Sequence, residues 1–533
     1  MSEPISIYEL LRRAAQRDPE QIALIDAEQH YSYRALLDRV EACAAGLAGQ
    51  GLGPGARLAI SMSKGVEEVV AMLAASRLRA AYANISRQWT PAQLLDAVIE
   101  LGADLLLVDA ERAQQLAGLP RPASLRWLVT TGEPGPGTLG WAALLEAGRR
   151  AELPERPGLD GDLCTIIFTS GSSGKPKGVL LSNRNIVSSI QSTVQYLGNH
   201  AGDRVLAVLP FCFNYGLGQL LTMLAVGGTT VLHKNFLATD LLEALQRHRI
   251  TGLAGIPPLW TDIVEVLEDA PQRFPALRYI SNAGGKCAER VLAALPQCFP
   301  DQQIFLMYGM TEAVRSSYLA PAEFAAKRGA LGRAVPNAEL LVLHPEGRLC
   351  RPGEVGELVH RGPSVALGYL NAPLASREKF RALPLQAGVA TAPDERLCFS
   401  GDLVRLDADG VLWYVGRSDR MIKSSGYRIS PTEIEDVLST APGVQKAIVF
   451  GQDDERLGQK IIALLTTAND ETPNPAGLRQ HCRGRLAPYM TPVVFHHWRG
   501  PLPLTGNGKI DVPQLIQRYQ HLAPSRQAHT TQH

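Results

Sequence analysis

The sequence has 533 residues, of which 45% are hydrophobic and 20% are charged, the ordinary mixture of a globular protein. This length exceeds what one compact core usually holds, so we expect at least two domains. The 53 basic and 52 acidic residues give a formal charge of +1, which excludes a global attraction to nucleic acid or to an anionic membrane. Any anion must therefore be bound locally.

The cysteines and the N-terminal stretch bear on the compartment. Eight cysteines are scattered without a CxxC pair or a metal-like cluster with histidine, so reduced and mostly buried thiols are expected. The first residues lack the basic-then-apolar order of a secretion signal, and no run approaches the ~18 apolar residues of a membrane span. These features predict a cytoplasmic protein with neither a nucleic acid nor a membrane as partner.

Strand-like and helix-like segments alternate from the beginning of the chain, which predicts an α/β fold with much parallel sheet. Strands are expected over 57–62 and 104–109, and a helix over 65–78. Thr90, with a proline after it, is a favourable helix start, and Gly102 is a favourable stop. The sequence therefore predicts a helix over 91–101.

A glycine-rich loop lies between two further strands. Residues 131–160 are rich in proline and glycine and are interpreted as a connection between subdomains. Strands are then expected over 164–169 and 178–182, joined by the loop of "TSGSSGKPKGV" (169–179). A helix is expected over 183–197, where apolar residues recur at helical spacing.

The last part of the chain has the pattern of a smaller domain. Charges and glycines interrupt the apolar rhythm over 416–430, and strands flanked by helices are expected over 444–450 and 460–467. This pattern is sufficient for an α+β domain. We therefore expect a large domain over 1–418 and a small one over 419–533.

The glycine-rich loop has the composition of an anion site, because glycine amides, hydroxyls and lysines all donate hydrogen bonds. A solvated surface turn is the alternative. A mononucleotide P-loop, GxxxxGK[ST], is excluded because Gly171, Gly174 and Lys175 are too closely spaced and Pro176 stands where the hydroxyl is needed. A dinucleotide fingerprint is excluded too, since no G-x-G-x-x-G opens a helix after a strand.

The loop instead resembles the signature of the AMP-forming adenylating superfamily, whose members include acyl- and aryl-CoA ligases, luciferases and the adenylation domains of nonribosomal peptide synthetases. The run ends in Pro176, Lys177, Gly178 and Val179, which match the family's P-K-G-V, and the remaining motifs follow in family order. The resemblance implies that ATP or AMP is bound by Thr169, Ser170, Gly171, Ser172, Ser173, Gly174 and Lys177.

The segment "MYGMTEA" (307–313) looks like the family's Y-G-x-T-E motif. The resemblance implies that Tyr308 packs on adenine beside Gly309, that Thr311 meets the α-phosphate, and that Glu312 holds magnesium. An oxygen ligand on a hard cation and a hydroxyl on phosphate suit a charged leaving group.

Further motifs complete the nucleotide site that the resemblance implies. Gly284 and Gly285 correspond to the glycine pair under the nucleotide, Asp402 to the acid on the ribose hydroxyls, and Arg417 to a ribose or phosphate contact. A segment over 356–371 matches a structural motif of the family. "LPLTGNGKID" resembles the closing motif, whose lysine is here Lys509.

These residues imply a two-step reaction without a side-chain nucleophile. The substrate carboxylate would attack the α-phosphate of ATP, and Lys509, Thr311 and Glu312 with Mg²⁺ would stabilise the charge that develops. The family's fold is then expected: a large domain of stacked α/β subdomains with a β-barrel-like subdomain, and a mobile C-terminal domain. Asp419 matches the hinge, and Lys423 and Gly426 match the thioester-forming face.

The acid pocket is inferred from the same resemblance. Amino-acid-activating members have an aspartate where this chain has Asn214, and a neutral amide forms no ion pair with an α-ammonium. An aryl, cyclic or fatty acid is therefore expected rather than a free α-amino acid, although Asn214 could serve packing alone. The other implied lining residues are Phe213, Gly218, Ser281, Ala283 and Met307.

Three questions stay open at this stage. Arg315 maps near the lining, where it either recognises a polar or second acidic group or pairs with a structural carboxylate. No carrier segment follows the lysine motif, so the acceptor is expected in trans: coenzyme A, the phosphopantetheine of a carrier protein, or an amine that yields an amide. A stand-alone amino-acid adenylation enzyme and a non-catalytic ATP-binding protein are the remaining alternatives, the latter disfavoured because Lys509, Glu312 and Asp402 are all present.

Overall fold

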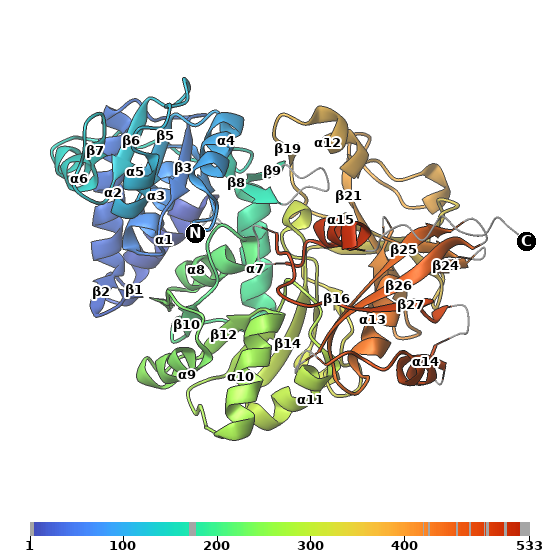
Figure 1. The fold of residues 1–533 in the computed structure, drawn as a ribbon. Coiled ribbons are helices and arrows are strands. Elements are labelled where there is room, and N and C mark those ends of the chain that lie inside the picture. The colour runs from blue at the N-terminus through green and yellow to red at the C-terminus, as the bar shows by residue number, and fades with distance from the viewer. Residues whose placement is uncertain are drawn as a thin grey trace, which may run out of the picture. The chain divides into compact units, whose positions relative to one another are not determined.

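The chain divides into two units in the computed structural model, which describes residues 5–169, 177–418, 420–424, 427–454, 457–467, 471–483, 485–486, 490–505 and 509–522 (Figure 1). The first unit comprises Met1–Glu354, Leu358–Ser400 and Leu406–Trp413, and the second comprises Val355–Glu357, Gly401–Arg405 and Tyr414–His533. The domain boundary expected between 418 and 419 stays a prediction.

One sheet of the first unit collects the strands around the glycine-rich loop. Its order is β19-β9-β8-β4-β3-β5-β6-β7 among the described residues. The strands are β3 (Arg57–Ser61), β4 (Ala81–Asn84), β5 (Leu105–Val108), β6 (Trp127–Thr130), β7 (Leu139–Gly140), β8 (Leu163–Thr169), β9 (Lys177–Ser182) and β19 (Gly368–Tyr369). The strands from β4 to β7 are parallel, and β8 and β9 form the predicted antiparallel pair on either side of the loop.

A second sheet follows in the order β16-β15-β14-β13-β12-β10-β11-β1-β2. The strands are β1 (Ile22–Asp26), β2 (Gln29–Ser32), β10 (Arg204–Ala207), β11 (Thr229–Leu232), β12 (Gly252–Gly255), β13 (Tyr279–Asn282), β14 (Gln303–Tyr308), β15 (Ser317–Leu319) and β16 (Arg333–Ala334). Strands β10 to β14 run parallel, so their carboxyl ends meet at one edge.

Helices lie between these two sheets and on the outer face of each. Buried side chains between the sheets come from α1 (Ile7–Arg17), α2 (Tyr33–Gly49), α3 (Val66–Arg77), α7 (Asn183–Leu197) and α8 (Asn214–Val226). The outer faces are covered by α4 (Pro91–Leu101) and α5 (Ala110–Leu116) on the first sheet, and by α9 (Ala238–Arg247), α10 (Pro257–Asp269) and α11 (Glu289–Cys298) on the second.

Helices on both faces of the sheet explain why its strands consist of continuous apolar residues. Leu105 and Leu107 face the helices between the sheets, whereas Leu106 and Val108 face the outer helices. A parallel strand that is buried on both faces needs apolar residues at every position. The predicted alternation of strands and helices is confirmed, and α4 begins with a capping box at Thr90 and ends at Gly102 as expected.

The connection expected over 131–160 was wrong in part, because it contains β7 and the helix α6 (Trp141–Arg149). Helix α6 packs closely on α2: a Cβ at Gly148 would lie 1.8 Å from the carbonyl oxygen of Ala42, and one at Gly46 would lie 2.3 Å from that of Leu144. The proline- and glycine-rich composition of 131–160 was taken as a loop signal, and the helix within it was not predicted.

The remaining strands and helices form two smaller sheets. One contains β17 (Glu339–Leu343), β18 (Val355–Arg361), β20 (Phe380–Arg381), β21 (Leu397–Leu406) and β22 (Leu412–Arg417), with α12 (Pro373–Lys379) before β20. Short 3₁₀ turns are η1 (Thr311–Ala313), η2 (Pro321–Glu323) and η3 (Leu385–Ala387). The sheet of β17, β18, β20, β21 and β22 corresponds to the expected barrel-like subdomain.

The second unit has a sheet of its own, with helices on both faces. The sheet consists of β23 (Ile422–Ser424), β24 (Tyr427–Ile429), β25 (Val444–Asp454), β26 (Gly458–Thr467) and β27 (Val494–His497). Helices α13 (Pro431–Ser439) and α14 (Pro475–Arg483) bury side chains on one face, and α15 (Val512–Leu522) does so on the other. The predicted small α+β arrangement is confirmed.

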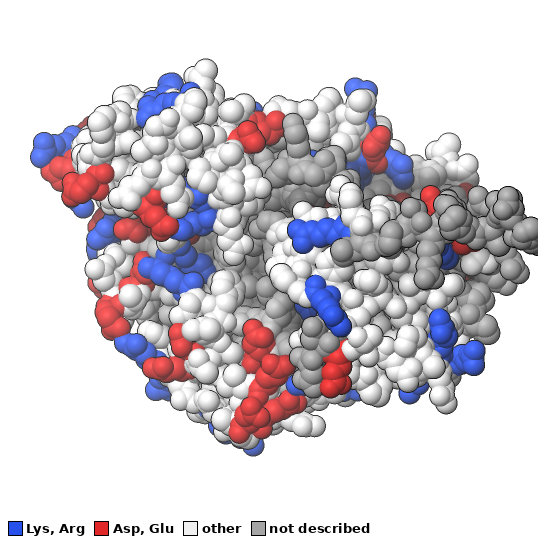
Figure 2. Space-filling model, viewed as in Figure 1, with Lys and Arg blue, Asp and Glu red and all other residues white. Residues whose placement is uncertain are grey.

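The surface and the cysteines agree with the composition. Basic and acidic side chains are interspersed on the face seen in Figure 2. All eight cysteines are free, and six of them are buried. No helix in the described part of the chain combines the length and apolar character needed to cross a bilayer. The cytoplasmic location stays a prediction.

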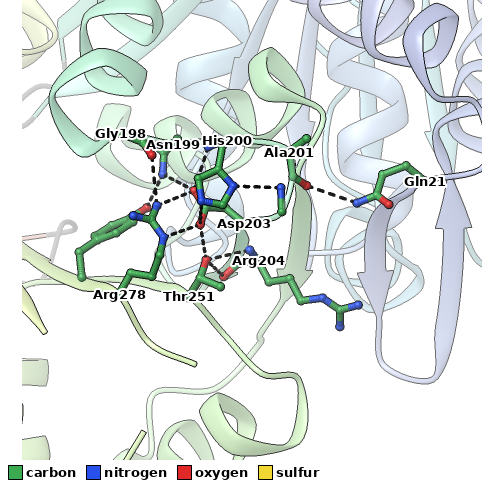
Figure 3. A network of polar contacts seen from close by, with 11 residues as sticks. Gln21, Gly198, Asn199, His200, Ala201, Asp203, Arg204, Thr251 and Arg278 are labelled. Carbon is green, nitrogen blue, oxygen red and sulfur yellow. Dashed lines mark hydrogen bonds and ion pairs between the residues drawn. The ribbon is translucent and has the colours of Figure 1, made fainter. Parts of the chain in front are cut away.

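A buried carboxylate joins the amino ends of three parallel strands in the second sheet (Figure 3). Asp203, which precedes β10, is fully buried and accepts hydrogen bonds from Arg278 before β13, at 2.7 and 2.9 Å, and from Thr251 before β12, at 2.8 Å. The His200 amide and the Asn199 side chain also donate to it. Burial favours protonation of Asp203, but these partners outweigh it and hold its pKa below the usual value.

We expect Asp203→Ala to reduce the free energy of unfolding by about 2 to 4 kcal/mol, because the Arg278 guanidinium and Thr251 lose a charged, buried partner. Urea unfolding followed by circular dichroism measures this change. The matched control is Glu20→Ala, whose ion pair with Arg34 is exposed on both sides and should contribute about 1 kcal/mol or less. Equal effects of the two substitutions would contradict the role given to Asp203.

Candidate active site

The segment after β14 is folded tightly. Tyr308 ends β14, η1 follows, and the Ser316 amide donates to the Tyr308 carbonyl at 3.1 Å. Val314 has a φ of 51°, which is rare for a β-branched residue and costs free energy. A Cβ at Gly309 would lie 2.8 Å from the carbonyl oxygen of Val314, so a side chain does not fit there. The loop thereby holds η1 at the carboxyl end of β14.

Glu312, in η1, is held by a segment that is distant in the sequence. The Tyr369 hydroxyl donates to Oε1 of Glu312 at 2.6 Å, and the Ala366 amide donates to its carbonyl oxygen at 2.9 Å. Strand β19 pairs with β9, and Nζ of Lys177 lies 5.5 Å from the centroid of the Tyr369 ring. The structure thus gathers a carboxylate, a phenol and an ammonium from three motifs.

The strands at the glycine-rich loop place its two described ends side by side. Thr169 faces Lys177 across the β8–β9 ladder, and its hydroxyl donates to the Lys177 carbonyl at 3.4 Å. The other predicted phosphate-binding residues lie outside the described residues; they are Ser170, Gly171, Ser172, Ser173 and Gly174.

Asn214 opens α8, directly after Phe213, and reaches the same 3₁₀ turn. Its Nδ2 donates to the Thr311 carbonyl at 3.4 Å. Its Oδ1 is buried and has no hydrogen-bond partner within the described part of the chain. The amide is therefore available to accept a hydrogen bond, but it supplies no negative charge for an ammonium.

Tyrosine hydroxyls stand among the predicted lining residues. Oη of Tyr215 lies 2.8 Å from Oγ and 2.9 Å from the carbonyl oxygen of buried Ser281. Ala283 and Met307 are buried in one cluster, where the Tyr196 hydroxyl donates to the Met307 sulfur at 2.8 Å. Sequence reasoning missed Tyr196 and Tyr215, because their role follows from packing between α7, α8 and the strands.

The glycine pair after β13 has a conformational requirement. Gly284 has a φ of 82°, which L side chains rarely adopt. The Asn282 side chain donates to the Gly285 carbonyl at 3.2 Å, and a Cβ at Gly285 would lie 3.3 Å from the Pro257 ring. This turn leaves an uncluttered backbone at the carboxyl end of β13.

The second unit brings together three further predicted residues. Nη1 of Arg417 lies 3.1 Å from Oδ1 of buried Asp402. Lys509 keeps exposed surface, and its carbonyl accepts a hydrogen bond from the Thr505 amide at 2.7 Å. Dehydration lowers the pKa of Lys509, the Asp402 carboxylate opposes this shift, and Arg417 adds to it.

The residues implied for the hinge and the thioester face stay predictions. Asp419 and Gly426 lie outside the described residues, and of Lys423 only the backbone is described, within β23. The tail after residue 522 lies outside them as well.

A buried histidine beside Tyr308 escaped the sequence analysis. The His360 ring lies nearly parallel to the Tyr308 ring, at 22° and with 6.1 Å between centroids. His360 is 3% exposed, and neither ring nitrogen has a hydrogen-bond partner within the described ranges. Burial, and secondarily the Lys379 charge, lowers the pKa of His360 to about 3. The imidazole is therefore neutral, and no local sequence pattern marks it.

Comparisons with known proteins bear on both parts of the chain. The family described as "AMP-binding enzyme" matches residues 11–370, and the family described as "AMP-binding enzyme C-terminal domain" matches residues 433–509. The solved structure of o-succinylbenzoate CoA synthetase (MenE) from Bacillus subtilis, in complex with the acyl-adenylate intermediate OSB-AMP, superposes with a TM-score of 0.83 at 26% identity. The match covers 97% of this chain and 98% of that one.

Curated relatives fall into two groups by length. Tyrocidine synthase 3 of Brevibacillus parabrevis is 29% identical over 98% of this chain, which spans only 8% of that protein. Indoleacetate–CoA ligase of Aromatoleum aromaticum is 28% identical over 96% of this chain and 99% of its own length. The chain thus corresponds to a small part of the first relative and to nearly the whole of the second.

The buried, neutral His360 predicts a loss of stability in acid. Its folded pKa of about 3 lies below the ~6.5 of an unfolded histidine, so the unfolded chain binds a proton first as the pH falls below about 6.5. Between pH 7.5 and 5.5, the wild type should lose about 1 kcal/mol more unfolding free energy than His360→Leu. Urea unfolding at both pH values measures this, with exposed His30→Gln as control. A His360→Leu protein with the wild-type pH dependence would contradict the assignment.

Proposed function

Because the chain belongs to the family of AMP-binding enzymes, we propose that it uses ATP to convert a carboxylic acid into an acyl-adenylate and passes the acyl group to a thiol. The observation that carries this proposal is the convergence of Lys177, Tyr369 and Glu312 beside the glycine-rich loop. The family and the two-part α/β fold were both predicted from the sequence, and both are confirmed.

The first step is a substitution at the α-phosphorus of ATP. A substrate carboxylate oxygen forms a bond to phosphorus, the bond to the bridging oxygen breaks, and pyrophosphate leaves with that electron pair. Thr311 is assigned to the α-phosphate, and Lys509 to the charge that develops on the reacting oxygens. The second step is attack of a thiolate on the acyl carbonyl, which expels AMP.

The residues present suit magnesium without a dedicated protein cage. No group of three or more His, Cys, Asp or Glu that could hold a metal ion occurs within the described part of the chain. Mg²⁺ usually binds through one or two carboxylates, substrate phosphates and water, and Glu312 is positioned by Tyr369 to supply one carboxylate. When bound, the ion supplies positive charge against the phosphate oxygens.

Nucleotide contacts are assigned to both units. In the first unit we assign Tyr308 to the adenine and the turn at Gly284 and Gly285 to the backbone beneath it. In the second unit we assign Asp402, oriented by Arg417, to the ribose hydroxyls, which a carboxylate can accept in pairs.

The acceptor is proposed to be coenzyme A. The support is the match to indoleacetate–CoA ligase over nearly the whole of both chains. A carrier protein acting in trans is the second candidate, because the relatives of greater length include tyrocidine synthase 3. For the acid, the neutral Asn214 at the start of α8 favours an aryl, cyclic or fatty acid over a free α-amino acid.

Substrate-dependent exchange of labelled pyrophosphate into ATP, together with hydroxylamine trapping of the adenylate, tests the proposal. The panel contains benzoates, cyclic acids, medium-chain fatty acids and α-amino acids. We expect exchange with at least one acid that lacks an α-amino group and none with the free α-amino acids. Formation of ADP would contradict adenylation, and strong turnover of an α-amino acid would contradict the role given to Asn214.

Lys509→Ala should separate the two half-reactions. Loss of one donor to the developing charge lowers a rate by about 100- to 1,000-fold in comparable sites, so we expect such a loss in adenylate formation. Thioester formation from a supplied acyl-adenylate should decrease much less. Rapid-quench measurement of each half-reaction checks this, with exposed Lys446→Ala of the same unit as control. Equal losses in both half-reactions would refute the role of Lys509.

A further inference from the structure

Arg315 is a buried cation without an anionic partner. The residue is 6% exposed, and its Nε is buried without a hydrogen-bond partner within the described ranges. No hydrogen bond or ion pair of its guanidinium occurs among those residues. The guanidinium instead lies over an aromatic ring, with its central carbon 4.9 Å from the centroid of Tyr215. A cation–π contact offsets only part of the cost of burying a charge.

Arg315 lies beside a narrow, closely packed recess. The recess is lined by Ser188, Ser189 and Ser192 of α7, by Pro336 to Ala338, and by Ser364. We call this the serine recess. The Ser192 hydroxyl donates to the Pro336 carbonyl at 2.6 Å, which ties α7 to the opposite wall. The lining also contains Val335 and Pro363, and it has no carboxylate that could pair with the Arg315 guanidinium.

Tyr215 connects the serine recess with the predicted acid pocket. Its ring makes a cation–π contact with the Arg315 guanidinium, and its hydroxyl contacts Ser281. Gly218, one turn along α8 from Tyr215, lies against the same guanidinium: a Cβ there would be 3.6 Å from Nη2. Because Gly218 and Ser281 are both assigned to the pocket, Arg315 is placed where the distal end of the substrate would lie.

We propose that Arg315 binds a second carboxylate of the substrate, so that the acid activated by this protein is a dicarboxylic acid. This inference rests on the proposed function, since it names the acid that the adenylation step takes. One carboxylate reacts with ATP, and the other stays ionised and accepts hydrogen bonds from the guanidinium, a strong and directional pairing. The alternative was that Arg315 pairs with a structural carboxylate, but no such ion pair occurs among the described residues.

The experiment compares diacids with their monomethyl esters in pyrophosphate exchange. The series contains succinate, glutarate, adipate and homophthalate, because Arg315 alone does not set the distance between the two carboxylates. Sulfonate analogues are included to separate recognition of a carboxylate from recognition of negative charge. A charged hydrogen bond typically changes kcat/KM by about 10- to 100-fold, so at least one diacid should exceed its ester by that factor. Exchange with esters or monoacids at rates equal to those of all diacids would overturn this inference and leave adenylation intact. Exchange with no acid at all would contradict both proposals.

Two substitutions test whether the preference belongs to Arg315. In Arg315→Gln the ratio of diacid to ester should decrease to about threefold or less, whereas Arg315→Lys should retain most of it, since charge persists. Isothermal titration with the preferred diacid gives a readout independent of turnover, and ATP affinity and thermal unfolding report on folding. An unchanged ratio in Arg315→Gln would overturn the inference.

Gly218→Ala provides a second variant in which the guanidinium is retained. Alanine suits a helix, and the added methyl makes ordinary contact at 3.6 Å, so folding should be preserved. It narrows the space beside Nη2, and we expect KM for the diacid to increase about three- to tenfold, with a smaller change in kcat. An unchanged KM for the diacid would count against a ligand group at this position.

Discussion

The buried carboxylate of Asp203 is the interaction on which the arrangement of the second sheet depends. It receives donors from the residues that precede β12 and β13 and stands itself before β10. Joining the amino ends of parallel strands sets their register, and the same register decides what stands at their carboxyl ends. At that opposite edge, Asn282 ends β13 and Tyr308 ends its neighbour β14, and ligand sites of parallel sheets form at such edges.

Some buried polar groups have hydrogen-bond partners within the fold, and others have none. Asp203 and Arg278 satisfy each other, as buried polar groups usually do. At the candidate site, in contrast, Oδ1 of Asn214, Nε of Arg315 and both nitrogens of His360 have no partner among the described residues. Such atoms also occur elsewhere in the described chain, for example at Ser61 and Trp260. Each of them costs stability, and those at the candidate site remain able to pair with a bound molecule.

Backbone strain also occurs in the segment after β14. Val314 adopts a positive φ directly after η1, and Gly309 permits the chain to turn back on itself without a side-chain clash. The turn is held from outside by the Tyr369 hydroxyl and the Ala366 amide, both of which contact Glu312. The proposed chemistry needs Thr311 and Glu312 in defined positions, and a rigid, strained loop supplies that without reorganisation during the reaction.

The sequence by itself determined the features that rest on local physics. Helix α4 could be predicted from its caps, the β8–loop–β9 pair from its apolar runs and glycines, and the family from motifs in order. Helix α6 was missed because proline- and glycine-rich stretches flank it, and its own Gly148 serves packing on α2 rather than a turn. Only the tertiary structure decided that Tyr369 contacts Glu312, that His360 is neutral, and that Arg315 has no carboxylate beside it among the described residues. Caps and periodicity act over a few residues, whereas the partner of a buried side chain depends on segments that are distant along the chain and meet only when the sheets and helices pack.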